Sequence, residues 1–539
     1  MAKLGNFAKV YIAPPLTLSI TPCPFKMLPM RITPRLAHHA RRSFHPALQT
    51  TPLLTRNFAT EVQPEQTGLR SIADLPGITH DELLIRFQKD PMNFHLVLSG
   101  AWHDLGQPAL FKMPVITSPN EWSLQTTDLE VCKHILTNNK YWYRPATLFL
   151  EYCYGRVTDG KGIHGIVNRN PPDWEKHRSI ANKALLHPKA NARFVVDMDD
   201  HARTLVSRLR EQSSNQRSVD VAPALQNYTF SVIMKAAFGE LVDFESGSNS
   251  EGVQVFEAVG SLLDAARNYA WMPPPYPDNE IIRTLNDELL KIRDFGIRLM
   301  DERRSRAARG EDIGHTDFAS AVFMLRDENG QMLEASDVIT DSLDLLVGGT
   351  DTTAAGLSFA LHNLGRRPDI LQKAYDEVAP LMRSKNDAAV TNEEINSLAY
   401  VNAILKETLR LTPPAALNGR VAGISDAING IDIPAGTTVV ISTMDIQHSD
   451  KYYDRPKEFV PERWLDKNVK INPYAWLPFG AGARGCLGQR LSVTEAKVAL
   501  AHLIYNFDFK SEKQEELPTA MGVTMSPLGP VNISFKERN

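Results

Sequence analysis

The chain has 539 residues, of which 43% are hydrophobic and 23% charged, with a formal net charge of -4. This is an ordinary globular composition, and the weak negative charge gives no indication of nucleic-acid binding. The cysteines are Cys23, Cys132, Cys153 and Cys486, and no two of them form a C-x-x-C pair. Zinc-ribbon and iron–sulfur sites therefore lack ligands, and a disulfide-rich secreted protein is not indicated.

The first 60 residues differ from the rest of the chain. They contain eight lysines and arginines and no acidic residue, which leaves about -12 on the remainder. Residues 35–45 can form a short basic amphipathic helix. An Arg-rich, acid-free leader is typical of a mitochondrial transit peptide, and a disordered basic tail is the alternative. We expect 1–60 to be a transit peptide and 61–539 the folded domain. No apolar run near the start is long enough to span a membrane.

The body of the chain shows mainly helical patterns. Periodicity predicts helices over 172–187, 195–212, 280–305, 336–366 and 393–411, the fourth beginning after Ser336 and ending before Pro368. Short strand patterns occur near 420–442, with Asn429-Gly430 as a hairpin turn. The loop 269–277 is rich in proline and aromatic residues, so it is neither helix nor central strand. It could pack on its own domain or contact a membrane. The expected fold is mainly α with small β-sheets.

The most specific motif lies at 479–488, Phe-Gly-Ala-Gly-Ala-Arg-Gly-Cys-Leu-Gly, followed by a helical pattern from Leu491 to about Tyr505. A cysteine just before a helix meets unpaired backbone N–H groups that favour its thiolate. A thiolate ligand to heme iron favours cleavage of the O–O bond. The motif matches all five specified positions of Phe-x-x-Gly-x-Arg-x-Cys-x-Gly, and therefore resembles the heme-binding signature of the cytochrome P450 family.

The resemblance covers roughly residues 70–539 and implies the fold of that family, heme b as cofactor and Cys486 as axial ligand of the iron. It assigns Asp351 and Thr352 to proton delivery. The residues that it implies for heme binding are Trp174, Arg178, Arg420, Phe479 and Arg484. It further implies a structural ion-pair network of Glu407, Arg410 and Arg463. The two histidines His177 and His448 are expected to be solvated or packing residues rather than ligands.

The implied activity is monooxygenation of a lipophilic small molecule, such as a sterol, a fatty acid or a secondary metabolite, with O₂ and two electrons. Its pocket is expected between the 144–168 loop, residues 346–349 and residues 415–417. The leader favours the mitochondrial class, hence the matrix side of the inner membrane and a ferredoxin donor docking on Lys406, Arg490 and Lys183. Asn402 and Gln489 replace basic residues of that class. The alternatives are a diflavin reductase as donor, a heme-thiolate isomerase or dehydratase, and a heme sensor without turnover.

Overall fold

The structure is a computed structural model that describes residues 68–538 except 117, 183–187, 216, 245–249, 312–316 and 324–333. The expected transit peptide, 1–60, lies outside the described residues. The helices are α1 His80–Lys89, α2 Phe94–Asp104, α3 Leu129–Thr137, α4 Leu148–Val157, α5 Asp173–Ala181, α6 Pro188–Asn215, α7 Ala222–Phe238, α8 Glu251–Tyr269, α9 Glu280–Ala308, α10 Phe318–Phe323, α11 Ala335–Gly365, α12 Pro368–Ser384, α13 Asn392–Ser397, α14 Ala399–Leu411, α15 Thr443–Gln447 and α16 Gln489–Asn506. Short 3-10 turns cover Ile72–Asp74, Pro461–Trp464 and Pro473–Ala475.

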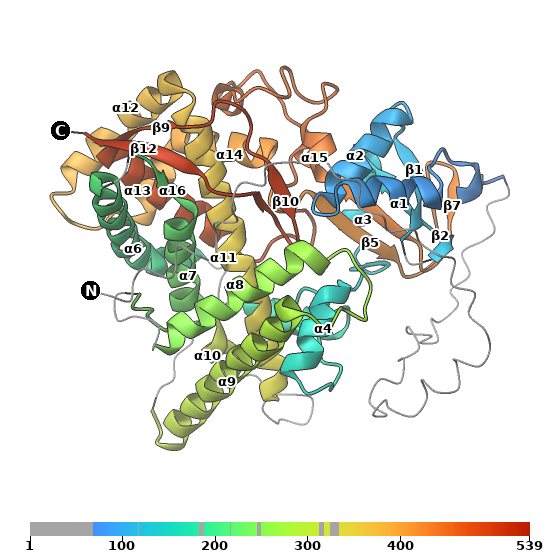
Figure 1. Ribbon diagram of the computed structural model, residues 1–539, viewed down its shortest axis with the longest axis horizontal. Coiled ribbons are helices and arrows are strands. Elements are labelled where there is room, and N and C mark those ends of the chain that lie inside the picture. The colour runs from blue at the N-terminus through green and yellow to red at the C-terminus, as the bar shows by residue number, and fades with distance from the viewer. Residues whose placement is uncertain are drawn as a thin grey trace, which may run out of the picture. The chain divides into compact units, whose positions relative to one another are not determined.

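Helix α11 is the central element of the helical part (Figure 1), and it contacts α7, α9, α14 and α16. Most of its side chains are buried, and these include the carboxylates of Asp341, Asp344 and Asp351 as well as apolar residues. Gly349 permits the close approach of α7, because a Cβ added there would lie 2.6 Å from Cγ1 of Ile233. The helix is regular through its Gly348-Gly349 pair, without the local distortion that such residues can cause.

The strands of the described residues form several small, separate sheets. Strands β1 Leu110–Val115, β2 Ser118–Thr126, β8 Thr438–Ser442, β5 Leu417–Ala422 and β3 Trp142–Tyr143 form one sheet in that order, with only the β2–β8 pair parallel. The other sheets pair β6 Asp426–Ile428 with β7 Ile431–Ile433, β10 Thr519–Met521 with β11 Met525–Pro527, and β12 Asn532–Glu537 with both β4 Val219–Asp220 and β9 Phe507–Ser511. The fold class, mainly α with small sheets, is thereby confirmed.

The predicted turn of the β6–β7 hairpin is present, with φ of 51° at Asn429 and 73° at Gly430. Three predicted boundaries were wrong. Helix α11 begins with Glu334, not Ser336, at its N-cap. The expected 393–411 helix is two helices separated at Leu398. Helix α6 starts at Pro188, well before the predicted residue 195.

The loop at 269–277 packs most of its aromatic side chains on its own domain. The indole of Trp271 donates to the carbonyl oxygen of Met521 at 2.7 Å, and the Tyr276 ring meets those of Phe149, Tyr152 and Tyr269. Met272 and the three prolines that follow it are exposed. In the described part of the chain, no helix is long and apolar enough to cross a membrane.

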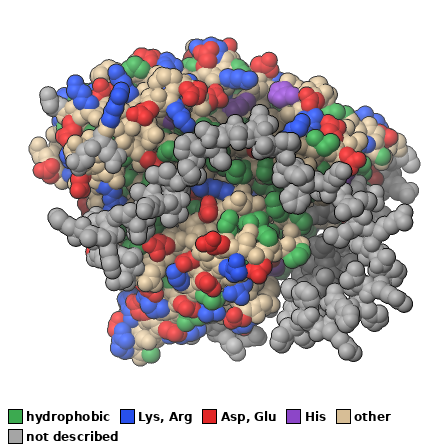
Figure 2. Space-filling model, in the orientation of Figure 1, with side chains coloured by type: hydrophobic (Ala, Val, Ile, Leu, Met, Phe, Trp, Pro, Cys, Tyr) green, Lys and Arg blue, Asp and Glu red, His purple; other side chains and the backbone are tan. Residues whose placement is uncertain are grey.

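Figure 2 shows one face of the molecule, where basic and acidic side chains are interspersed over α9. Several of them form pairs, such as Arg298 with Glu251 at 2.6 Å and Lys291 with Glu288 at 2.7 Å. Charges of opposite sign largely cancel at such short separations, so this helix carries no patch of a single sign.

Candidate functional site

Cys486 lies in the turn that leads into α16. Its amide donates to the carbonyl of Phe479 at 2.8 Å, and the turn requires a positive φ of 70° at Gly482. A Cβ on Gly482 would lie 2.0 Å from the Leu136 carbonyl oxygen, so only glycine fits there. The thiol is accessible from a cavity, although protein surrounds it closely.

The electrostatic surroundings of the Cys486 thiol act in two directions. Burial raises the pKa of the Cys486 thiol above its ordinary value, while backbone N–H groups of Gly488 and Gln489 and the charges of Arg178 and Arg144 oppose that rise. The N–H groups are those left unpaired at the start of α16, as expected from the helix geometry. The protein groups alone therefore leave the thiol protonated, and a bound cation would be required to ionise it fully.

The cavity beside Cys486 has a volume of about 320 Å³. One wall is α11, which contributes Gly348, Gly349 and Thr352, and the opposite wall is the turn that carries the cysteine. Further lining residues are Arg144, Ile166, Val167, Trp174, Arg178, Ile233, Leu409, Ala415, Leu417, Phe479 and Arg484. The three segments expected to line a pocket, 144–168, 346–349 and 415–417, all contribute residues.

Four arginines surround one edge of this cavity. Arg144, Arg178 and Arg484 line it, and Arg420, 1% exposed, is close enough to Arg144 and Arg484 for their charges to act on it. Within the described residues, none of the four forms an ion pair with a carboxylate. Burial, and then the neighbouring arginines, lowers the pKa of both Arg420 and Arg484 to about 9. Two buried cations, Arg420 and Arg484, and two half-buried ones, Arg144 and Arg178, without a carboxylate partner fit a dianionic ligand.

Neutral groups hold two of these arginines in place. Arg484 lies over the Trp174 ring at 3.8 Å from its centroid and donates to the carbonyl of Arg169 at 2.7 Å. Arg420 donates to Oδ1 of Asn418 at 2.6 Å and to the Gly419 carbonyl at 2.8 Å. The Nε of Arg178 is buried and has no hydrogen-bond partner among the described residues. The two propionates of heme b would supply the missing anions.

Arg144 was missed as a site residue by the sequence reasoning. No motif surrounds it, and its role depends on the pairing of β3 with β5, which carries Arg420. Burial lowers the pKa of Arg144, with the charges of Asp344, Tyr154 and Cys486 opposing the shift. Only the three-dimensional structure places this side chain in the same cavity as the other arginines.

The two members of the expected acid–alcohol pair take different positions. Thr352 lines the cavity, and its hydroxyl donates to the carbonyl of Gly348 at 2.7 Å. Asp351 is 3% exposed and accepts a hydrogen bond from the hydroxyl of Thr524 in the β10–β11 turn. The Asp351 side chain is not part of the cavity wall. A proton that passes between the two residues would need a path around the helix.

The expected ion-pair network is present in the structure. Glu407 is fully buried and accepts from Arg410 at 2.9 Å and from Arg463 at 3.0 Å. The indole of Trp464 also donates to Glu407, at 2.9 Å. Arg410 also donates to backbone carbonyls at 447, 456 and 458. The network therefore connects α14 to the segment that leads to the cysteine turn.

The two histidines that were not expected to be ligands are both engaged in contacts within the protein. His177 is buried and its Nδ1 lies 2.5 Å from Oδ2 of Asp341, whereas His448 hydrogen-bonds the Leu411 carbonyl.

Among the basic residues expected to dock a donor, Lys406 lies over the rings of Trp464 and Trp476, at 5.5 and 6.0 Å. Arg490 is exposed on α16, and Lys183 lies outside the described residues.

Comparison with known proteins decides the family. The family model described as Cytochrome P450 matches residues 126–536, which is more than half of the chain. The chain belongs to the cytochrome P450 family. Members of this family are monooxygenases that bind heme b through a cysteine thiolate, and this P450 has the corresponding fold.

Its relatives are distant. A protein named "Probable cytochrome P450 12c1, mitochondrial" from Drosophila melanogaster is 25% identical over 522 residues, covering 89% of this chain and 95% of the relative. Cytochrome P450 3A11 of Mus musculus is 27% identical, covering 73% and 78% of the two chains. Cytochrome P450 3A5 of Homo sapiens is 26% identical, covering 73% and 81%.

Proposed function

We propose that Cys486 is the axial ligand of the heme iron and that this P450 hydroxylates a lipophilic small molecule. The observation that carries the proposal is the placement of a thiol, four arginines without carboxylate partners and the Thr352 hydroxyl around one cavity. With two electrons from the donor and two protons, bound heme would activate dioxygen, so that one oxygen atom enters a C–H bond of the substrate and the other leaves as water.

The chain's own residues have separate tasks in this proposal. Arg144, Arg178, Arg420 and Arg484 neutralise the heme propionates, and Trp174 keeps the Arg484 guanidinium in place. The backbone N–H groups at the start of α16 stabilise the thiolate of Cys486. The Thr352 hydroxyl holds a proton within the cavity, and Asp351, which is bonded to Thr524 outside the cavity wall, is the proposed source of that proton. Glu407, Arg410 and Arg463 support the cysteine turn without touching the reacting atoms.

Two variants test these assignments, one through its spectrum and the other through the fate of its electrons. In the reduced carbon monoxide complex, Cys486→Ala should lose the red-shifted band of thiolate-bound heme. Thr352→Ala should keep that band but divert NAD(P)H electrons to hydrogen peroxide, because the step that it supports is worth roughly 10²–10⁴-fold. Thr350→Ala is the matched control, since Thr350 makes the same bond to the fourth preceding carbonyl but does not line the cavity. An unchanged spectrum in Cys486→Ala would contradict the ligand assignment. An equal yield of product per NAD(P)H oxidised in the two threonine variants would contradict the role of Thr352.

Two other activities remain alternatives. A heme-thiolate isomerase or dehydratase acts on peroxides without a reductase, and a heme sensor has no turnover. Neither requires a hydroxyl in the cavity wall at Thr352. NAD(P)H-dependent incorporation of one ¹⁸O atom from ¹⁸O₂ into product distinguishes the three functions, because only a monooxygenase gives that product.

The donor and the location belong to the same proposal. We propose a mitochondrial protein on the matrix side of the inner membrane, reduced by a ferredoxin that docks near Lys406 and Arg490. The name of the Drosophila relative and the acid-free leader support this. Membrane contact through 269–277 would involve Met272 and the exposed prolines, since Trp271 and Tyr276 pack inward.

Ferredoxin-driven reduction should slow as salt rises, because screening weakens steering by a few charges. If a diflavin reductase supports turnover and a ferredoxin does not, the proposed donor is wrong.

A further inference from the structure

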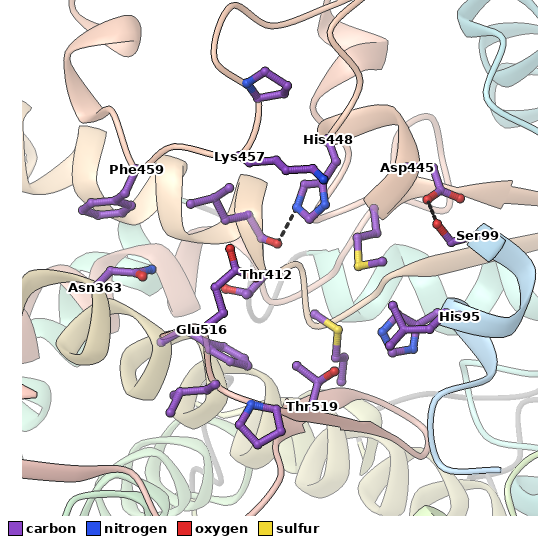
Figure 3. Close-up of a pocket in the computed structure, with 18 of the residues that line it drawn as sticks. His95, Ser99, Asn363, Thr412, Asp445, His448, Lys457, Phe459, Glu516 and Thr519 are labelled. Carbon is purple, nitrogen blue, oxygen red and sulfur yellow. Dashed lines mark hydrogen bonds between the residues drawn. The ribbon is translucent and has the colours of Figure 1, made fainter. Parts of the chain in front are cut away.

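The choice of substrate depends on the Cys486 cavity and not on a larger cavity, of about 980 Å³, which shares no lining residue with it. Polar side chains of the larger cavity are engaged within the protein (Figure 3). His448 is bonded to a backbone carbonyl, and Asp445 accepts from Ser99 at 2.6 Å. Both ring nitrogens of His95 are buried, without a partner among the described residues and out of reach of a ligand.

Part of the wall of the Cys486 cavity is a short segment, residues 164–167, between α4 and α5. Its side chains Ile166 and Val167 line the cavity. Asp344 lines it as well, from α11, about two turns before Thr352. A molecule in this cavity would therefore contact both the 164–167 segment and α11.

The carboxylate of Asp344 joins this segment to two helices. Its Oδ2 accepts the backbone N–H of Val167 at 2.7 Å, and its Oδ1 accepts the hydroxyl of Tyr154, on α4, at 2.6 Å. Burial raises the pKa of Asp344 to about 7, while these two hydrogen bonds oppose the rise. Both bonds therefore favour the ionised carboxylate in the position that the structure shows.

Gly165 allows the segment to approach α11 closely. A Cβ on Gly165 would lie 2.6 Å from the carbonyl oxygen of Thr340 and still closer to Oδ2 of Asp344. The Thr340 hydroxyl also donates to the His164 carbonyl at 3.2 Å. The segment is thus held against α11 on both sides of Gly165, and a shift of this backbone would move Ile166 in the cavity wall.

Two other roles for the Asp344 carboxylate fit the contacts less well. Both of its oxygens already accept hydrogen bonds from the protein, so a cationic substrate would have to compete with Tyr154 and Val167. Asp344 also precedes Thr352 by eight residues, or about 12 Å along the helix axis, which is too far for direct proton transfer.

We propose that Asp344 is a positioning residue for substrate selection, which holds Ile166 and Val167 against α11 and so sets the shape of the pocket. The proposal rests on the function proposed above, in which the Cys486 cavity takes the heme and its substrate. Removing the two hydrogen bonds should change which molecules fit the cavity, whereas the arginines and the cysteine would hold the heme as before.

Titration of the holoenzyme with two azoles tests the proposal, because azoles bind the heme iron without turnover. Imidazole is small, whereas 4-phenylimidazole carries a ring that must fit between the walls. Asp344→Ala should weaken 4-phenylimidazole at least fivefold and imidazole less than twofold. Asp344→Asn should stay within twofold of the parent for both, since its oxygen can accept from Val167 and its NH₂ group can donate to the Tyr154 oxygen.

Asp199→Ala is the matched control. Asp199 is also a buried carboxylate that accepts a backbone N–H, that of Val390, but it lies outside the cavity wall. This variant should leave the ratio of the two affinities unchanged. Gly165→Ala should displace the segment from its own side and reproduce the effect of Asp344→Ala, and it replaces that variant if Asp344→Ala does not fold.

Three results would overturn the positioning role. They are an unchanged affinity ratio in Asp344→Ala (or in Gly165→Ala as its replacement), an equal change in Asp199→Ala, and an Asp344→Asn variant as weak as Asp344→Ala, which would show that the charge matters instead. A parent enzyme that binds both azoles but forms no hydroxylated product would count against the proposed function and not against the role of Asp344.

Discussion

Replacing Glu407 with glutamine should be among the most damaging conservative changes in this P450. The two oxygens of Glu407 accept from five donors, which belong to Arg410, Arg463, Trp464 and the Val460 amide. A glutamine would turn an NH₂ group toward some of these donors. It would also leave two guanidinium groups, 0% and 9% exposed, without a counter-charge.

The expected loss can be estimated from the burial of that network. Breaking a buried ion pair by removing one partner costs about 3–5 kcal/mol. An unfolding entropy of about 2 cal/mol/K per residue, taken over the folded body of the chain, converts this loss to about 3–5 °C in Tm. Heme content should fall as well, because the network supports the segment that leads to the cysteine turn.

Thermal unfolding and the reduced carbon monoxide spectrum measure the two effects of Glu407→Gln. The matched control is Glu462→Gln in the same segment, where the carboxylate bonds Lys373 and Tyr400 at 2.7 Å but is 43% exposed. An exposed pair is worth about 0–1 kcal/mol, so this control should lose at most about 1 °C. If Glu407→Gln keeps its heme and unfolds within 1 °C of the parent, the reasoning is refuted.

Three more predictions concern other parts of the chain. The folded pKa of His95, about 4, lies below its unfolded value of 6.5, so stability is lost as pH falls through that interval, by about 2 kcal/mol at pH 5. His95→Gln should remove that part of the loss, and equal acid sensitivity of Tm in the two proteins would contradict it. Gly349→Ala should cost about 1–3 kcal/mol through its clash with Ile233, whereas Gly348→Ala, with nothing within 4 Å, should keep Tm and narrow the Cys486 cavity in substrate-binding titrations. Residues 1–60 should carry a fluorescent passenger into mitochondria, and replacing Arg35, Arg41 and Arg42 with glutamate should leave it in the cytosol on fractionation.

Much of the site could be predicted where the chemistry is local in sequence. The cysteine turn, the helix that follows it and the Asn429-Gly430 hairpin depend on glycine φ angles and on short-range spacing, both of which the sequence displays. The boundaries at Ser336 and Leu398 were not predicted, because neither Glu334 nor Leu398 makes a side-chain cap hydrogen bond that the sequence could indicate, and helix ends are uncertain by one or two residues. The direction of the Asp351 side chain likewise depends on Thr524, 173 residues away.

The arginines around the Cys486 cavity were predicted only where a local sequence pattern marks them. Arg484 belongs to the 479–488 motif, and the family resemblance also implied Arg178 and Arg420. Arg144 has no such mark, and its neighbours are defined by a strand pairing across nearly 280 residues. The unpartnered His95 was also invisible, since burial without a partner is a property of the folded chain and not of a pattern.

The crowding of Arg144, Arg178, Arg420 and Arg484 has a consequence for the life of this P450 in the cell. Without a dianion among them, the mutual repulsion of these four cations lowers the stability of the folded protein until heme binds. Such a chain opens more often, and chaperones and proteases act on the opened form. Cellular heme supply would then set how much of this enzyme survives, so that its abundance follows porphyrin availability without any dedicated regulator.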